Sequence, residues 1–313
     1  MSHSRVPLCA NFAARAIGYF GRGLSVARAY ARVRAFPSRK APNNFLRNIP
    51  LFLRTIANNT LQYRADVFLV GFLSALFGAE NTGKSVTPLV PNDIKDVQLI
   101  VRVLTSLSKA YTTKHTIAGL QECMEALGGI GYLENDETPE INVARMYRDA
   151  NVFAIWEGTT DILSTDTVKV IRGREGPKVI EAIENWLRNT LGDWAFGDSS
   201  LGASGLPNEA KAVVAAWKAF KALPADMDGL MPQARGVVKH LGDIIAATLL
   251  IVDAERDEDP VAVECARRFC LINFAPYTGA KPKAETWQQI ADWDNRIAFE
   301  ADPNPSAGNR ARL

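Results

Sequence analysis

Apolar residues recur along this chain at intervals of three and four positions, and strict alternation is rare. The clearest face comprises Val97, Ile100, Val101, Leu104 and Leu107, and it continues through Ile117, Leu120, Met124 and Leu127. A helix brings such positions to one side because it has 3.6 residues per turn. The pattern therefore predicts an all-α protein.

Turn-forming residues divide this pattern into segments. We expect helices at about 12–35 and 50–78, a long helix that starts at 91–93 and ends at the 128–129 glycine pair, and another helix after Thr160. Long helices joined by short loops favour an antiparallel four-helix bundle.

Helical spacing continues beyond position 174, with three further amphipathic faces. They comprise Val179, Ile180, Ile183, Trp186 and Leu187, then Val213, Val214, Trp217 and Phe220, then Val237, Val238, Leu241, Ile244, Ile245 and Leu249. The Gly- and Ser-rich stretch 192–207 is the expected flexible connection. We therefore divide the chain into a bundle over 1–174, a helical extension over 175–301 and a disordered tail over 302–313.

Three short motifs follow one another in the middle of the chain. They are Leu-Gly-Gly-Ile-Gly-Tyr at 127–132, Tyr-Arg-Asp at 147–149 and Trp-Glu-Gly-Thr at 156–159. The last places Glu157 on an apolar approach, directly before a turn that can begin a helix. Desolvation would raise the pKa of this carboxyl toward the value that a general base needs. The alternative is an ordinary acidic residue at a helix start, which describes most such glutamates.

The order and spacing of these motifs resemble the C-terminal helical domain of the acyl-CoA dehydrogenases, flavoenzymes that oxidise acyl-CoA thioesters at Cα–Cβ. The resemblance is densest over 122–168 and extends back to about Leu24, while the extension after 174 resembles the alkylation-response branch. It implies FAD as cofactor, an acyl-CoA substrate and a homodimer or homotetramer. The family's N-terminal and middle β domains have no counterpart here. One interpretation is therefore that the chain is a truncated, inactive form of such an enzyme.

The resemblance assigns catalytic and substrate roles around Glu157. This residue matches the base that removes the thioester α-proton while hydride leaves the β-carbon for the flavin. Phe153, Ile155 and Trp156 would surround it with a dry pocket. Trp156 and Gly158 would contact the substrate.

The resemblance also implies contacts to FAD, mostly that of a neighbouring subunit. Arg34 stands where an arginine reaches the phosphates, although a solvated arginine would fit the pattern as well. Gly129 stands where a missing side chain lets backbone approach the cofactor, and Thr159 where a hydroxyl lies near the flavin. Glu125 and Asp161 replace the glutamines that are usual in the family, and an acid near a pyrophosphate would repel it.

The amino end departs from the family pattern at two places. Phe36-Pro37 replaces a Phe-Gly and falls one residue early. Cys9 falls where many members carry an arginine that contacts substrate.

Residues 78–85, Gly-Ala-Glu-Asn-Thr-Gly-Lys-Ser, match the phosphate-binding P-loop pattern. That chemistry needs a strand before the loop and a helix directly after it. Pro88 and Pro91 would fall in the first turns of that helix, where proline removes backbone donors. The sequence therefore argues against a nucleotide triphosphatase.

Charge is unevenly distributed. Residues 1–65 contain eleven lysines and arginines and no acid, whereas 175–313 contain 15 basic and 20 acidic residues. Duplex DNA binding, known in alkylation-response relatives, needs clustered positive charge, so we expect no nucleic-acid partner. The alternative function is a non-catalytic DNA-binding or oligomer-assembly protein. The basic start also admits a mitochondrial transit peptide, although 24–34 looks like the first bundle helix.

The remaining signals concern metals, membranes and location. The four cysteines and three histidines lack metal-ligand spacing, which predicts no metal and a reduced, intracellular protein. The apolar run 67–77 is too short to span a bilayer. Ala311-Arg312-Leu313 resembles a degenerate peroxisomal tripeptide, so peroxisome, cytoplasm and mitochondrion all stay open.

Overall fold

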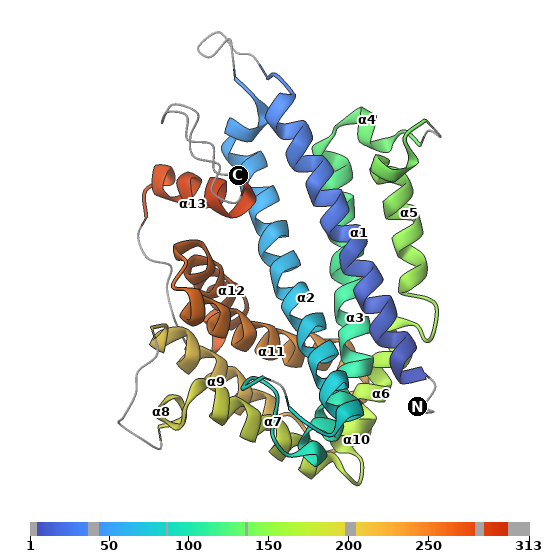
Figure 1. Cartoon of the computed structure of the whole chain (residues 1–313), viewed down its shortest axis with the longest axis vertical. Helices are drawn as coiled ribbons and strands as arrows, with labels where there is room; N and C mark the ends of the chain where they lie inside the picture. Colours follow the sequence, from blue (N-terminus) through green and yellow to red (C-terminus); the bar gives the residue numbers. More distant parts are fainter. Residues whose placement is uncertain are drawn as a thin grey trace.

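The computed structural model describes residues 5–36, 44–85, 87–134, 137–197, 205–278 and 285–299. Within these residues every regular element is a helix, apart from one isolated bridge between Ala35 and Phe45 (Figure 1). The all-α prediction is confirmed. The expected tail at 302–313, the tripeptide at its end and Pro37 lie outside the described residues.

Three long helices lie side by side and form the largest part of the molecule (Figure 1). They are α1 (Arg5–Val33), α2 (Pro50–Thr82) and α3 (Ile94–Ala126). The apolar stripe predicted for α3 is buried from Val97 to Leu107 and at Leu120, whereas Ile117, Met124 and Leu127 are partly buried. Asp93 caps this helix by accepting from the Lys95 amide at 2.9 Å. A carboxylate at this position satisfies an amide that has no partner within the helix.

Two shorter helices complete this part of the chain. The chain passes through α4 (Gly129–Tyr132) and a 3₁₀ turn at Pro139–Ile141 to α5 (Val143–Phe153), which packs on α1 and α3. The helix expected after Thr160 is α6 (Thr160–Arg172), which packs on α3, α7 and α11. Helix α5, and not α6, is therefore the helix that packs against both α1 and α3.

The P-loop pattern falls on a helix end. Residues 79–82 form the last turn of α2, and Gly83 ends it in the left-handed conformation at φ 68° while its amide donates to the Ala79 carbonyl at 2.8 Å. The exposed Lys84 follows in a turn, and α3 starts only at Ile94. A helix carboxyl end presents carbonyl oxygens, which do not bind phosphate.

The extension consists of helices that pack against the bundle. They are α7 (Gly176–Leu191), α8 (Asp193–Phe196), α9 (Pro207–Lys221), α10 (Met227–Leu230), α11 (Ala234–Asp257), α12 (Pro260–Thr278) and α13 (Trp287–Phe299). Helix α11 contacts α2, α3 and α6, and one hydrophobic core runs through bundle and extension. Helix α8 lies within the predicted connection 192–207.

Polar contacts also join the extension to the bundle. The Tyr111 hydroxyl of α3 donates to Asp243 of α11 at 2.7 Å. Asp294 of α13 is buried and accepts from Arg54 of α2 at 2.6 Å and from Arg268 of α12. These pairs fix α11 and α13 against the long helices, because a buried carboxylate needs such partners.

Candidate active site at the turn between α5 and α6

Residues 154–159 connect α5 to α6, and we name this segment the base turn. The amides of Ile155 and Trp156 donate to the Val152 carbonyl at 2.9 and 3.0 Å, which closes the end of α5. Glu157 follows at φ 56° and Gly158 at φ 114°. A left-handed conformation costs a residue with a Cβ roughly 1–2 kcal/mol. The surrounding contacts must therefore hold Glu157 in place.

The Glu157 side chain is half-buried, and its immediate neighbours are more open than the sequence suggested. Phe153 is buried, but Ile155 and Trp156 are 59% and 53% exposed. The Trp156 ring contacts Phe12 of α1 edge-on, with centroids 5.9 Å apart. The dry pocket predicted around Glu157 is therefore wrong for the described residues taken alone, since two of its three walls face outward.

Lys109 lies directly beneath the base turn and was missed by sequence reasoning. Its side chain is fully buried in the middle of α3, and its Nζ donates to the Gly158 carbonyl at 2.8 Å. Burial lowers the pKa of Lys109 to about 8, while interactions with Cys9 and Glu157 oppose this effect. A lysine within a long run of apolar and small residues was the signal in the sequence.

Cys9 packs against the same turn from α1. It is fully buried, and its Sγ lies 4.0 Å from the Glu157 carbonyl oxygen. The resemblance aligned this position with an arginine that contacts substrate. A buried cysteine instead supports the backbone of Glu157.

Helix α6 is anchored to α3 through Asp166, which lies in the middle of α6. Arg102 donates to both oxygens of Asp166 at 2.8 and 2.9 Å, and Ser106 donates to the same carboxylate. Burial raises the pKa of Asp166, but these hydrogen bonds outweigh it and the net shift is downward. The ionised Asp166 fixes the middle of α6 against α3.

The other predicted residues of this turn are exposed. Thr159 precedes α6, and its hydroxyl makes no capping hydrogen bond. Asp161 is also exposed and accepts from Arg235 of α11 at 2.6 Å. This hydrogen bond lowers the pKa of Asp161, so the acid at this position is ionised and paired within the chain.

Of the remaining predicted residues, Gly129 and Glu125 lie at the opposite end of α5, and Arg34 lies at the end of α1. Residues 128–131, which we name the glycine turn, start α4 beside the end of α3 (Figure 1). Gly129 is exposed, and a Cβ added there would meet nothing within 4 Å. Glu125 is exposed and accepts from Gln121 at 3.3 Å. Arg34 is exposed and follows the last residue of α1.

The predicted site residues thus form two groups. Helix α5 has eleven residues and is about 16 Å long, and it separates the base turn from the glycine turn. One group contains Trp156, Glu157, Gly158, Thr159 and Asp161. The other contains Gly129 and Glu125, while Arg34 follows the end of α1.

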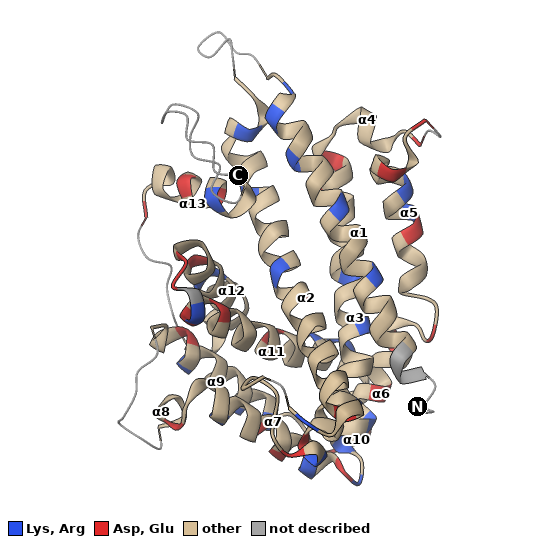
Figure 2. Cartoon of the chain, in the orientation of Figure 1, with Lys and Arg blue, Asp and Glu red and all other residues tan. Residues whose placement is uncertain are grey.

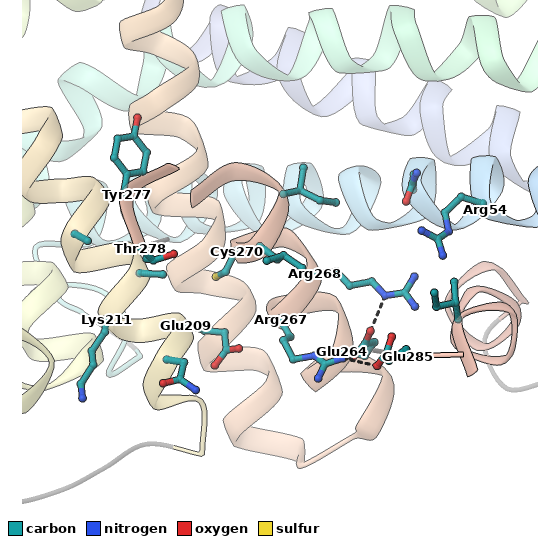
Figure 3. Close-up of a pocket in the computed structure, with 17 residues that line it drawn as sticks. Arg54, Glu209, Lys211, Glu264, Arg267, Arg268, Cys270, Tyr277, Thr278 and Glu285 are labelled. Carbon is teal, nitrogen blue, oxygen red and sulfur yellow. Dashed lines mark hydrogen bonds and ion pairs between the residues drawn. The ribbon is translucent and has the colours of Figure 1, made fainter. Parts of the chain in front are cut away.

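A pocket of about 650 Å³ lies away from both turns, between α2, α9, α12 and α13 (Figure 3). The charged side chains of α12 in this pocket pair with other charged side chains of its lining. Arg267 contacts Glu264 at 2.9 Å and Glu285 at 3.0 Å. None of the predicted site residues lines this pocket.

The described part of the chain holds no cluster of three or more His, Cys, Asp or Glu side chains suited to a metal ion. Its helices also fall short of the length and hydrophobicity required to cross a bilayer.

Comparison with known proteins extends these observations. Residues 90–171 match the family model described as acyl-CoA dehydrogenase, C-terminal domain. Acyl-CoA dehydrogenase family member 11 of Caenorhabditis elegans is 28% identical over 302 residues, which cover 92% of this chain and 45% of that protein.

Two solved structures share the fold. Caenorhabditis elegans ACDH-11 in complex with C11-CoA has a TM-score of 0.72 at 23% identity, covering 96% of this chain and 48% of that one. An acyl-CoA dehydrogenase from Bacillus anthracis complexed with FAD has a TM-score of 0.63 at 17% identity, covering 96% and 53%. The chain therefore spans about half the length of these relatives. Residues 90–171 belong to the C-terminal domain family of the acyl-CoA dehydrogenases, and the chain shares the helical fold of that part of these enzymes.

Proposed function

We propose that the base turn supplies the general base of an acyl-CoA dehydrogenase-type oxidation, with Glu157 as the residue that removes the α-proton of an acyl-CoA thioester. The geometry of Glu157 carries this proposal. Its backbone is held in a left-handed conformation above two fully buried side chains, Lys109 and Cys9, and the residue as a whole is partly buried. A base must be held in one orientation toward the proton that it abstracts.

The substrate class follows from the setting of the turn. Ile155 and Trp156 present exposed apolar surface beside the carboxylate, which suits an acyl chain. The Caenorhabditis elegans structure with C11-CoA is a complex of this kind in a protein of similar fold. Trp156 and the Gly158 backbone would line the acyl group near its α-carbon.

FAD is the cofactor that this reaction requires. The exposed predicted residues would form one side of its binding site. Gly129 has open space where a side chain would otherwise lie, so its backbone is free for close approach. The Thr159 hydroxyl is exposed and makes no capping hydrogen bond. When bound, FAD would supply the acceptor for the hydride that leaves the β-carbon. Arg34 would contribute positive charge toward its phosphates.

Two acids fit FAD less well. Glu125 lies at the glycine-turn end and Asp161 at the base-turn end, and each replaces the family's glutamine. Asp161 is paired with Arg235, which offsets its charge. The separation of the two turns agrees with a site completed by a second subunit, so we include a homodimer or homotetramer in the proposal. The electron acceptor stays undefined.

The test is the variant Glu157→Gln, which keeps the size of the side chain and removes its basicity. With FAD added, we expect acyl-CoA-dependent reduction of an artificial electron acceptor to fall about 10²–10⁴-fold, because a general base contributes that factor. The control Glu181→Gln changes an exposed acid on α7 and should leave the rate unchanged. Circular dichroism and flavin absorbance check that fold and FAD affinity persist. Full activity of Glu157→Gln, or no turnover by the unmodified chain, would refute the proposal.

The alternatives receive no support from a particular observation. Lysines and arginines are interleaved with acidic side chains along the described helices of the extension (Figure 2). Duplex binding needs positive charge gathered on one surface, so a nucleic-acid partner remains disfavoured. The peroxisomal location suggested by Ala311-Arg312-Leu313 and the mitochondrial alternative both remain predictions.

A further inference from the structure

We propose that Lys109 is a positioning residue for the Glu157 base, acting through its hydrogen bond to the Gly158 carbonyl. This inference rests on the proposed function. It concerns how the base is held, which neither the motif nor the matched family domain specifies.

The geometry places Lys109 at the part of the turn that most needs support. Glu157 and Gly158 both have positive φ, and Glu157 cannot adopt that conformation without strain. The Gly158 carbonyl is therefore an acceptor whose direction is coupled to the orientation of Glu157. The donor lies 2.8 Å away on α3, a different helix from those on either side of the turn. Release of this carbonyl would free the peptide between Gly158 and Thr159, which directly follows the peptide that joins Glu157 to Gly158.

Full burial gives this hydrogen bond its importance. A lysine with no exposed surface loses the hydration of its ammonium, a loss tolerated only where fixed acceptors replace water. Burial lowers the pKa of Lys109 to about 8, and Glu157 and Cys9 interact with it favourably. The ammonium is thus a positive group beneath the base turn, in favourable electrostatic interaction with Glu157.

Anchoring of the helices alone does not require Lys109. Ser106 and Arg102, about one and two turns away from Lys109 on α3, already bind Asp166 on α6. Phe12 packs on Phe153 and Trp156 from α1. The Lys109 contact instead reaches the peptide between Gly158 and Thr159, next to the strained backbone of Glu157.

The test compares Lys109→Met with Lys114→Met. Methionine keeps most of the volume of lysine and removes the donor and the charge, and Lys114 is an exposed lysine of the same helix. Hydrogen exchange is measured on the amides of 154–163, which include the bonded amides of Trp156 and Leu163. We expect these amides to exchange about tenfold faster in Lys109→Met, because a hydrogen bond from a charged donor is lost. Helix α11 should exchange at the unmodified rate, and Lys114→Met should match the unmodified chain throughout.

Kinetics then separate positioning from a general loss of structure. In the FAD-loaded chain, Lys109→Met should lower kcat about 10²-fold with little change in KM, since the base is displaced while the acyl-binding surface remains. Unchanged exchange at 154–163, an equal rise in all helices, or an unchanged kcat would overturn the inference. If the unmodified chain shows no turnover, the role of Glu157 fails, and the positioning role fails with it. If Glu157→Gln loses activity but Lys109→Met does not, only the inference about Lys109 fails.

Discussion

The base turn and the glycine turn lie at opposite ends of α5 and are built in different ways. The base turn rests on side chains from within the chain, because Lys109 and Cys9 are both buried beneath it. The glycine turn leaves Gly129 open, with nothing within 4 Å of the position of a Cβ. One turn is therefore oriented by this chain alone, whereas the other offers free backbone to a molecule outside it.

Two glycines of the glycine turn differ in the space around them: Gly131 has no room for a side chain, whereas Gly129 does. Substitution at Gly131 gives the largest effect that we expect. A Cβ at Gly131 would lie 2.0 Å from the Met124 carbonyl oxygen and 3.0 Å from Leu127 Cβ. We expect Gly131→Ala to lower the free energy of unfolding by about 3 kcal/mol, because backbone has to move to admit the methyl group. Urea denaturation measures this change.

The matched control is Gly129→Ala, two positions earlier. Its added methyl group meets open space, so the free energy of unfolding should change by less than about 1 kcal/mol. Flavin affinity should nevertheless fall in this variant, since the methyl group occupies the surface that we assign to the cofactor. Equal destabilisation by both variants would contradict the distinction between a packed and an open glycine.

Features of the two turns that depend on neighbouring residues in the chain could be predicted from the sequence, whereas features that depend on contacts between distant segments could not. Helix α3 was predictable because its apolar spacing and its start and end signals are local. The Gly-Thr step after Glu157 was predictable for the same reason. The burial of Lys109 depends on how α1, α5 and α6 pack around α3, and no local pattern encodes that. Likewise Asp161 finds its partner Arg235 on α11, 74 positions later.

The separation of the predicted site residues in the fold also could not be predicted from short sequence motifs. Motif order placed Gly129 and Glu157 in one family pattern, yet α5 runs between them as a spacer. The dry pocket around Glu157 was inferred only from the apolar residues that neighbour it in the sequence. Residues such as Trp156 are apolar and still exposed, because burial depends on what covers a surface and not on its composition.

Stability against pH gives the second prediction and tests the base-turn end. The pKa of Lys109 is about 8 in the folded chain and has an ordinary value of 10.5. Between these values the unfolded chain binds more protons at this site, so the free energy of unfolding rises with pH. Below pH 8 both states are protonated and the contribution is constant.

We expect the difference in unfolding free energy between the unmodified chain and Lys109→Met to rise by about 2 kcal/mol from pH 8 to pH 10. Urea denaturation at several pH values measures it. Lys114→Met should follow the unmodified chain in parallel, because Lys114 is exposed. A constant difference for Lys109→Met would show that Lys109 keeps its proton over this range, and the contrast between the two turns would then rest on hydrogen bonding alone.

The smallest expected effect compares the two acids that replace family glutamines. Asp161 is paired with Arg235, whereas the contact of Glu125 is the neutral Gln121 amide. Glu125→Gln should therefore raise FAD affinity roughly two- to fivefold, the range of an exposed charge interaction. Asp161→Gln also removes a negative charge and frees Arg235, but it does so at the base-turn end, so its gain should be smaller. Flavin titration at low and high salt measures both, and the gain in Glu125→Gln should shrink as salt screens the charge. A larger gain from Asp161→Gln would mean that the ion pair with Arg235 does not offset this acid, and that the base-turn end presents as much uncompensated negative charge to the cofactor as the glycine-turn end.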